Sequence, residues 1–269
     1  VYASPSVPTN NENSIYSGDY LYMGLFKPQD TGPWLGNVKK YELDEEHKMT
    51  PHLDPASKAL SDNARSEWTT GGNDGQDVAK GGAAQQIEVM IAAMKGKPDT
   101  DGLRNIYTYV YTPGASTNDL TTTRNKVLES NKVITGSMLG LGSVSEADRK
   151  AAITKIRETP FGAVIHSSPT VAHYDDSSRV VFVGAQDGFL HAINDATGQE
   201  EWAFVMPEHL GTIKDAHSTN PNAGNYYLDG HIGVPTVNGQ TILLLGARRR
   251  GDSYVALDIT THDRPRFLY

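Results

Sequence analysis

The feature that most constrains the fold is a repeat in the last third of the chain. Two stretches about 65 residues apart contain similar residues in the same order. The tripeptide at 169–171, Pro-Thr-Val, recurs at 235–237. Excluding a long loop at 208–230, the repeating unit has about 40 residues, the size of one four-stranded propeller blade. Four more pairs match at this spacing: Gly184 with Gly246, Ala192 with Ala256, Asn194 with Asp258, and Trp202 with Phe267.

The sequence of each unit predicts short strands joined by tight turns. In the first unit, "RVVFVGA" (179–185) and "FLHAI" (189–193) flank Asp187-Gly188, a dipeptide typical of hairpins, and "EEWAFV" (200–205) follows. In the second, "IGVPTV" (232–237) and "TILLLG" (241–246) flank Asn238-Gly239, and "SYVALDI" and "RFLY" follow. A four-stranded sheet cannot bury both faces alone, so it must pack against neighbours. The sequence therefore predicts an all-β dominated fold, a partial β-propeller with two repeated blades at about 161–269.

The segment before the repeats has a different composition. A strand pair is expected at 20–26 and 34–43, and a strand-like run at 105–111. Two helices are expected in the polar region at about 44–160. One presents Ile87 and Met94 on an apolar face together with Met90 and Ile91, and the other is capped by Ser145 with an ion pair from Glu146 to Lys150. We expect one incomplete propeller domain over 1–269, with 44–160 as a partly helical insertion; a separate small domain is the alternative.

Composition excludes several functions. The chain has 269 residues and a formal net charge of −8, so it has no basic field to hold nucleic acid or anionic lipid. It has no cysteine, which excludes disulfides, thiolate nucleophiles and cysteine-ligated metal centres. No apolar stretch approaches the roughly 18 residues of a membrane span. The chain starts at Val1 without a signal peptide, as expected of a mature or trimmed protein.

The segment 184–202, "GAQDGFLHAINDATGQEEW", resembles the tryptophan-docking repeat of quinoprotein-type propellers. Glycines permit its two tight turns, a small alanine allows close stacking of blades, and the tryptophan can pack against a neighbouring blade. This repeat identifies a fold and not a chemistry. The residues assigned to such structural docking are Gly184, Asp187, Gly188, Ala192, Gly198 and Trp202.

Longer blocks resemble the PilC/PilY-type family of type IV pilus tip-associated adhesins. They include "LFKPQDTGPWLGNVKKYEL", "KGGAAQQI", "RNIYTYV", "HSSPTV", "TGQEEWAFVMPEHL" and "YYLDGHIGVPTV". The resemblance implies an exported protein of the pilus tip, cell surface or periplasm that binds type IV pilins or minor pilins, and host-cell or abiotic surfaces. This sequence departs from the family pattern at Gly162-Ala163, where the family usually has Gly-Asp. Because the family's proteins are longer, a fragment is expected here.

The resemblance also implies calcium, bound in an Asp-rich loop that this chain lacks. We therefore expect no cofactor in this segment, and calcium only in family regions that are missing here. The weak local candidates for a metal are Asp74 and Asp77 in "NDGQD", which lacks the spacing and the terminal Glu of a calcium loop, so a solvated turn is expected instead. The surrounding "GGNDGQDVAKGG" is expected to be a flexible or exposed loop.

No catalytic residues are expected. Histidines such as His166, His191 and His231 are expected to bond the backbone of a neighbouring blade, and no nucleophile elbow is present. We expect a non-enzymatic adhesin or pilus-assembly factor. The alternatives are a periplasmic propeller scaffold of the outer-membrane assembly type and a fragment of a pyrroloquinoline quinone-dependent dehydrogenase. The candidate partner-binding residues are Tyr226, Tyr227, Arg248, Arg249 and Arg250.

Overall fold

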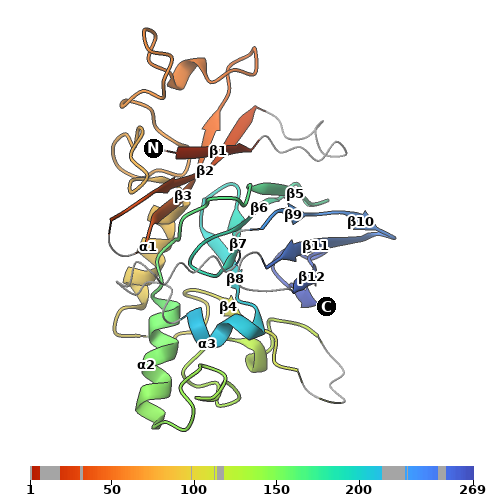
Figure 1. Cartoon of the computed structure of the whole chain (residues 1–269). Coiled ribbons are helices and arrows are strands. Elements are labelled where there is room, and N and C mark those ends of the chain that lie inside the picture. The colour runs from red at the N-terminus through yellow and green to blue at the C-terminus, as the bar shows by residue number, and fades with distance from the viewer. Residues whose placement is uncertain are drawn as a thin grey trace.

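The computed structural model describes residues 2–6, 19–30, 33–97, 99–111, 113, 118–213, 228, 230–247 and 253–269. In this part of the chain, three largely antiparallel sheets follow one another (Figure 1). The first contains β1 (Tyr2–Ser6), β2 (Tyr20–Lys27) and β3 (Leu35–Glu42) in that order. The strand pair expected at 20–26 and 34–43 is therefore confirmed, because β2 and β3 pair along their whole length.

The second and third sheets contain the repeated units. The second has the order β5 (Thr170–His173), β6 (Arg179–Gly184), β7 (Leu190–Asn194) and β8 (Glu200–Phe204). The third is built from β9 (Ile232–Gly233), β10 (Thr236–Val237), β11 (Gln240–Gly246), β12 (Tyr254–Asp258) and β13 (Arg266–Phe267). Their central hairpins share one register, since Phe182 lies opposite Ala192 and Leu244 lies opposite Ala256. The hairpins expected at Asp187-Gly188 and Asn238-Gly239 are confirmed.

The three sheets stack through their side chains. Successive residues of a strand point to opposite faces, and both faces of β6 are buried. Val181 and Val183 join an apolar cluster with Tyr22 and Val38 of the first sheet. Val180 and Phe182 join another cluster with Leu243, Leu245 and Leu257 of the third sheet. The expected all-β character is confirmed; the described residues contain three stacked sheets and no closed ring.

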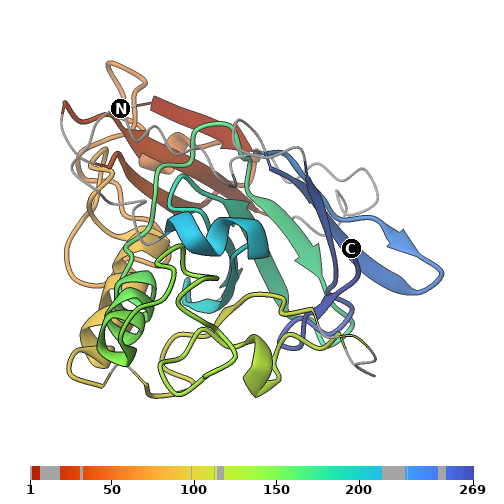
Figure 2. The same ribbon diagram turned by 60° about the horizontal axis from the view of Figure 1, so that its bottom comes forward.

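The insertion between β3 and β5 contains two main helices, α1 (Gly82–Met94) and α2 (Glu146–Arg157), on the side of the molecule away from the third sheet (Figure 2). Ile87 and Met94 of α1 are buried, and Ser145 caps α2 through the Asp148 amide, as expected. The expected pair between Glu146 and Lys150 is wrong, because Glu146 contacts Arg149 and Lys132 instead. Shorter elements are 3₁₀ turns at Thr50–His52, Thr123–Asn125 and Pro207–His209, the last leading into α3 (Leu210–Ile213).

Buried arginines hold the irregular parts of the insertion. Coil carbonyls have no ladder partner, so they need other donors when they are buried. The Arg104 guanidinium donates to the carbonyls of Arg157 and Thr159, at 2.8 and 2.6 Å. Arg149 donates to those of Asn131 and Ile134, at 3.1 and 3.0 Å. These arginines replace the regular hydrogen bonding that the insertion lacks.

The insertion also covers the outer edges of the second and third sheets. Of the strand-like run expected at 105–111, only β4 (Ile106–Tyr107) is a strand, and it adds to β8 in the parallel sense. Further along, the Phe267 amide donates to the Asn118 carbonyl at 2.8 Å, and the rings of Tyr109 and Phe267 stack at 4.0 Å. Covered edges cannot pair with other chains.

Candidate functional site

Trp202 lies at the junction of the second and third sheets. Its indole is buried beside Ala192, which lies opposite it on β7, and beside the ring of Phe182 at 5.8 Å. Its Nε1–H donates to the His262 carbonyl at 2.6 Å, in the turn that precedes β13. The indole therefore fastens one sheet to the next through both an apolar contact and a hydrogen bond.

Trp68 makes the equivalent contact at the junction of the first and second sheets. Its Nε1–H donates to the Asp195 carbonyl at 2.8 Å, in the turn between β7 and β8. Gly198 of that turn has φ of 73°, and a Cβ there would lie 2.4 Å from Trp68 Cγ. A glycine is thus required both by the turn and by the indole. Sequence reasoning missed Trp68, because it lies in the insertion, outside any repeat.

Asp187 begins a buried chain of charged groups in the second sheet. Its carboxylate accepts the Gly162 and Phe189 amides at 2.6 and 2.9 Å, and pairs with His191 Nε2 at 3.0 Å. His191 Nδ1 lies 2.6 Å from Glu200 Oε1, and Glu200 Oε2 pairs with Arg104 Nε at 2.7 Å. Two carboxylates therefore alternate with two cations, and all four side chains are fully buried.

Burial and pairing shift the pKa values in this chain of charges. Burial lowers the pKa of His191, but Asp187 and Glu200 outweigh it and raise that pKa to about 9. Burial raises the pKa of Glu200, whereas Arg104 and His191 bring it to about 2. The pKa of Asp187 is also lowered, since His191 outweighs burial. His191 thus bonds carboxylates, and the expectation that it bonds a neighbouring backbone is wrong.

The remaining docking residues lie at the ends of the β6–β7 hairpin. Gly188 has φ of 94°, which permits the tight turn after Asp187. The Gly184 amide donates to Ser167 Oγ at 3.0 Å, and a Cβ on Gly184 would lie 1.8 Å from the Leu228 carbonyl oxygen. The hairpin therefore approaches neighbouring backbone too closely for any larger residue at 184. A larger residue would therefore clash at Gly184 and be strained at Gly188.

Asp195 is the hub of a second charged cluster, between the first two sheets. Its carboxylate accepts the Tyr22 hydroxyl at 2.5 Å and pairs with Lys40 at 2.9 Å and with Arg179 at 2.8 Å. Beside it opens a polar pocket of about 340 Å³. Sequence reasoning identified none of these residues as a site. The pocket is lined by Tyr20, Lys40, Glu67, Ser177, Ser178, Arg179, Asn194, Asp195 and Ala196.

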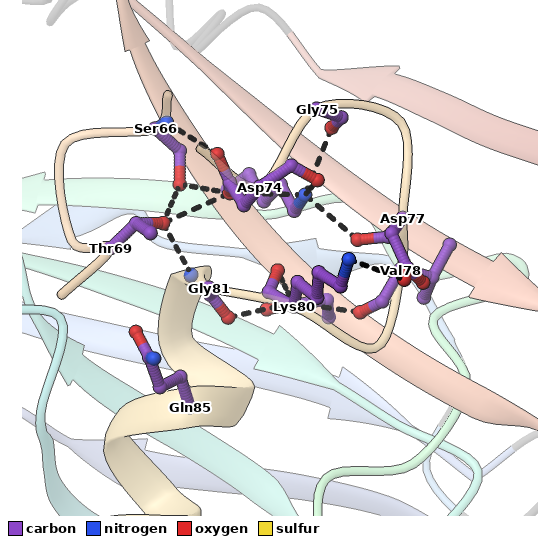
Figure 3. A network of polar contacts seen from close by, with 12 residues as sticks. Ser66, Thr69, Asp74, Gly75, Asp77, Val78, Lys80, Gly81 and Gln85 are labelled. Atoms are coloured by element: carbon purple, nitrogen blue, oxygen red, sulfur yellow. Dashed lines mark hydrogen bonds and ion pairs between the residues drawn. The ribbon is translucent and has the colours of Figure 1, made fainter. Parts of the chain in front are cut away.

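Asp74, a weak metal candidate, lies in a network of polar contacts that folds over the first sheet (Figure 3). Its carboxylate accepts the Ser66 amide at 2.9 Å and the hydroxyls of Ser66 and Thr69 at 2.7 and 2.9 Å. These donors lower its pKa against the opposing effect of burial. The expected solvated turn is wrong for Asp74, which is buried, and the expected flexible or exposed loop is wrong for this part of the stretch. The Asp77 carboxylate lies 3.7 Å from Lys80 Nζ, at the surface.

Other sequence-based candidates lie elsewhere. The candidate partner-binding residues fall outside the described residues: Tyr226, Tyr227 and Arg248 to Arg250. Their role in binding a partner therefore stays a prediction. Within the described ranges, no group of three or more His, Cys, Asp or Glu side chains is arranged to hold a metal ion. Among the same residues, the helices are too short or too polar to cross a membrane.

Two curated proteins are similar to parts of the chain. A "Type IV pilus biogenesis factor PilY1 homolog" from Xylella fastidiosa is 35% identical over 96 residues, 34% of this chain and 8% of that protein. A "Type IV pilus biogenesis factor PilY1" from Pseudomonas aeruginosa is 31% identical over 149 residues, 42% of this chain and 12% of that protein. No family model and no solved structure matches the sequence. The comparisons support a PilY1-like relationship over a small part of those proteins' length.

Proposed function

We propose that this chain is part of a non-enzymatic type IV pilus biogenesis protein that acts at the cell envelope or surface. The observation that carries the proposal is the similarity to two pilus biogenesis factors, at 35% and 31% identity. The described residues contribute stacked sheets, which are joined by apolar clusters, by the indoles of Trp68 and Trp202 and, between the first two sheets, by the ion pairs of Asp195. Such a structure suits a rigid support for binding surfaces.

We propose further that the sheets are successive blades of a β-propeller. The indoles of Trp68 and Trp202 fasten two consecutive junctions in the same way. The outer face of the third sheet leaves Leu244 and Tyr254 45% and 73% exposed, whereas Leu243 and Leu245 on its inner face are buried. An exposed apolar sheet face of this kind is expected where another blade packs.

The tryptophans also bear on the alternative of a quinone-dependent dehydrogenase. Enzymes of this kind commonly stack their cofactor on the ring of a tryptophan. Trp68 and Trp202 are buried between sheets, and Trp34 stacks on Phe26 at 6.0 Å. All three indoles therefore have structural contacts, which favours a binding protein over this enzyme and leaves the periplasmic scaffold as the second candidate.

The proposed partners are type IV pilins or minor pilins, contacted through loops and through the pocket beside Asp195. Arg179 is the pocket's partly exposed cation, with 27% of its side chain accessible. It could pair with a carboxylate on a partner. The surface residues Tyr226, Tyr227 and Arg248 to Arg250 remain candidates for the same role.

The test is deletion of the coding sequence in the source bacterium. We expect fewer surface pili by electron microscopy and loss of twitching motility, both restored by the wild-type gene. An Arg179→Glu variant that accumulates normally is expected to restore pili less well. The control is Arg124→Glu, because Arg124 is an exposed arginine of the insertion that does not line the pocket. Normal pili in the deletion strain would contradict the proposed function, and pull-downs would then test a scaffold role.

A further inference from the structure

Lys39 of β3 lies under the loop formed by residues 66–82. Its side chain is fully buried, and Asp74 beside it is 1% exposed. Lys39 Nζ lies 3.0 Å from Asp74 Oδ2. It also lies 3.2, 3.1 and 2.9 Å from the carbonyl oxygens of Asp74, Gly75 and Asp77. Four oxygens of one loop thus converge on a single nitrogen.

The loop is built to direct these oxygens inward. Asn37, two residues before Lys39 on the same face of β3, donates to the carbonyls of Val78 and Gly81, both at 2.9 Å. Gly81 has φ of 65°, and a Cβ there would lie 2.5 Å from Asp74 Oδ2. Figure 3 shows the resulting compact turn above the start of α1. The loop is therefore shaped around the position of the nitrogen.

The donor count indicates the chemical state of Lys39. An ammonium has three N–H donors, whereas a neutral amine has two. Three carbonyls accept from the nitrogen and a carboxylate lies beside it, so only the ammonium satisfies this set. Burial lowers the pKa of Lys39, and Asp74 opposes that shift.

The distances also distinguish this site from a calcium site. Calcium binds six to eight oxygens at about 2.3 to 2.6 Å and usually several carboxylates. Here four oxygens lie 2.9 to 3.2 Å from the nitrogen, and only one is a carboxylate oxygen. These values are ordinary for N–H···O hydrogen bonds.

We propose that the loop of residues 66–82 is a binding site for a primary ammonium ion, and that the Lys39 side chain is its permanent occupant. The side chain joins the loop to the first sheet and supplies the cation that a calcium loop would take from solution. The order of this loop then depends on no metal ion. This inference is independent of the proposed role in pilus biogenesis.

The test removes the Lys39 side chain and then adds a small ammonium ion to the variant. Lys39→Ala is refolded alone, with ethylammonium chloride, or with tetramethylammonium chloride, which has the same charge but no N–H donor. Tryptic cleavage at Arg65 and Lys80 reports the order of the loop. We expect cleavage of Lys39→Ala to be about tenfold faster than that of the wild-type chain, because local opening becomes easier. Ethylammonium should slow it again. The exposed Lys48→Ala is the matched control, and its cleavage should stay at the wild-type rate.

Three results would overturn the proposal. Cleavage of Lys39→Ala could remain at the wild-type rate, tetramethylammonium could protect as well as ethylammonium, or calcium chloride could protect the variant better than either. If Lys39→Ala does not fold, ¹⁵N NMR of the wild-type chain decides. A Lys39 nitrogen with the chemical shift of an ammonium and slowly exchanging protons supports the proposal. The shift of a neutral amine at neutral pH contradicts it.

Discussion

At the scale of single residues, one buried indole lies at each junction between sheets. Trp202 comes from a strand of the repeat, whereas Trp68 comes from an irregular segment of the insertion. Both donate Nε1–H to a carbonyl in a turn of the next sheet. The insertion therefore provides the first sheet with the docking residue that its own strands lack.

Replacement of either indole should destabilise the protein strongly. Trp68→Ala and Trp202→Ala each remove a buried ring and leave a cavity, so we expect each to lower the free energy of unfolding by about 3 to 5 kcal/mol. Trp34→Ala, at a partly exposed stack, is the control and should cost less. Urea unfolding followed by circular dichroism measures all three. A loss of under about 1 kcal/mol at Trp68 would contradict its docking role.

The buried charges predict a specific pH dependence. The pKa of His191 is raised to about 9 from 6.5, so its contribution to stability is complete below pH 6.5 and is lost as the pH rises through 9. The pKa of Glu200 is lowered to about 2 from 4.5, so its contribution is lost as the pH falls from 4.5 towards 2. Stability from this chain of charges is thus greatest at about pH 4.5 to 6.5.

The measurement is the free energy of unfolding in urea between pH 6 and 10. We expect a decline of up to about 3 kcal/mol in the wild-type chain, since each pKa unit corresponds to about 1.4 kcal/mol. In His191→Gln the decline over the same range should be smaller, although the variant is less stable at every pH. Equal slopes in the two proteins would exclude His191 as the cause.

At the scale of elements, tight turns and their partners fix how the sheets meet. The turn between β7 and β8 carries Asp195, whose carbonyl accepts from Trp68 and whose carboxylate binds groups of both sheets. Gly198 in the same turn lies against the Trp68 ring. One short turn therefore holds the first sheet, the second sheet and the insertion together.

Gly198→Ala should disturb this turn in two ways. The new Cβ would clash with Trp68, and alanine is strained at φ of 73°. We expect a loss of roughly 2 kcal/mol or more and a red-shifted tryptophan emission, because the indole becomes more exposed. Gly239→Ala is the matched control, since Gly239 has φ of 78° but open space around it. An unchanged emission spectrum in Gly198→Ala would contradict this account.

At the scale of the whole molecule, local patterns predicted much of the fold. Turn dipeptides and alternating apolar residues predicted the strand pairs and hairpins, and an apolar face and a serine cap predicted α1 and α2. The polar contacts that the insertion makes with the sheets were not predictable in this way. Lys39 and Asp74 are 35 residues apart, and Trp68 and Asp195 are 127 apart. Such pairs have no local signal, because they depend on how the insertion folds back over the first sheet.

The open face of the third sheet tests the propeller proposal. Leu244→Glu should change the stability of the 269-residue chain by no more than about 0.5 kcal/mol, since Leu244 is exposed there. In a longer protein that contains further blades, the same change should lower thermal stability and cellular abundance. The neighbouring Leu243 is buried, so Leu243→Glu should destabilise both forms. A longer form that tolerates Leu244→Glu would argue against another blade at this face.

The Asp195 hub also has a consequence for biosynthesis. Lys40 is translated 155 residues before Asp195, and Tyr22 precedes it by 173. At about 5 to 20 residues per second, the ribosome needs on the order of ten seconds to cover that distance. During this interval the nascent first sheet has the Lys40 ammonium and the Tyr22 hydroxyl but not the Asp195 carboxylate that pairs with them. The first sheet therefore docks on Asp195 only late in translation or after it.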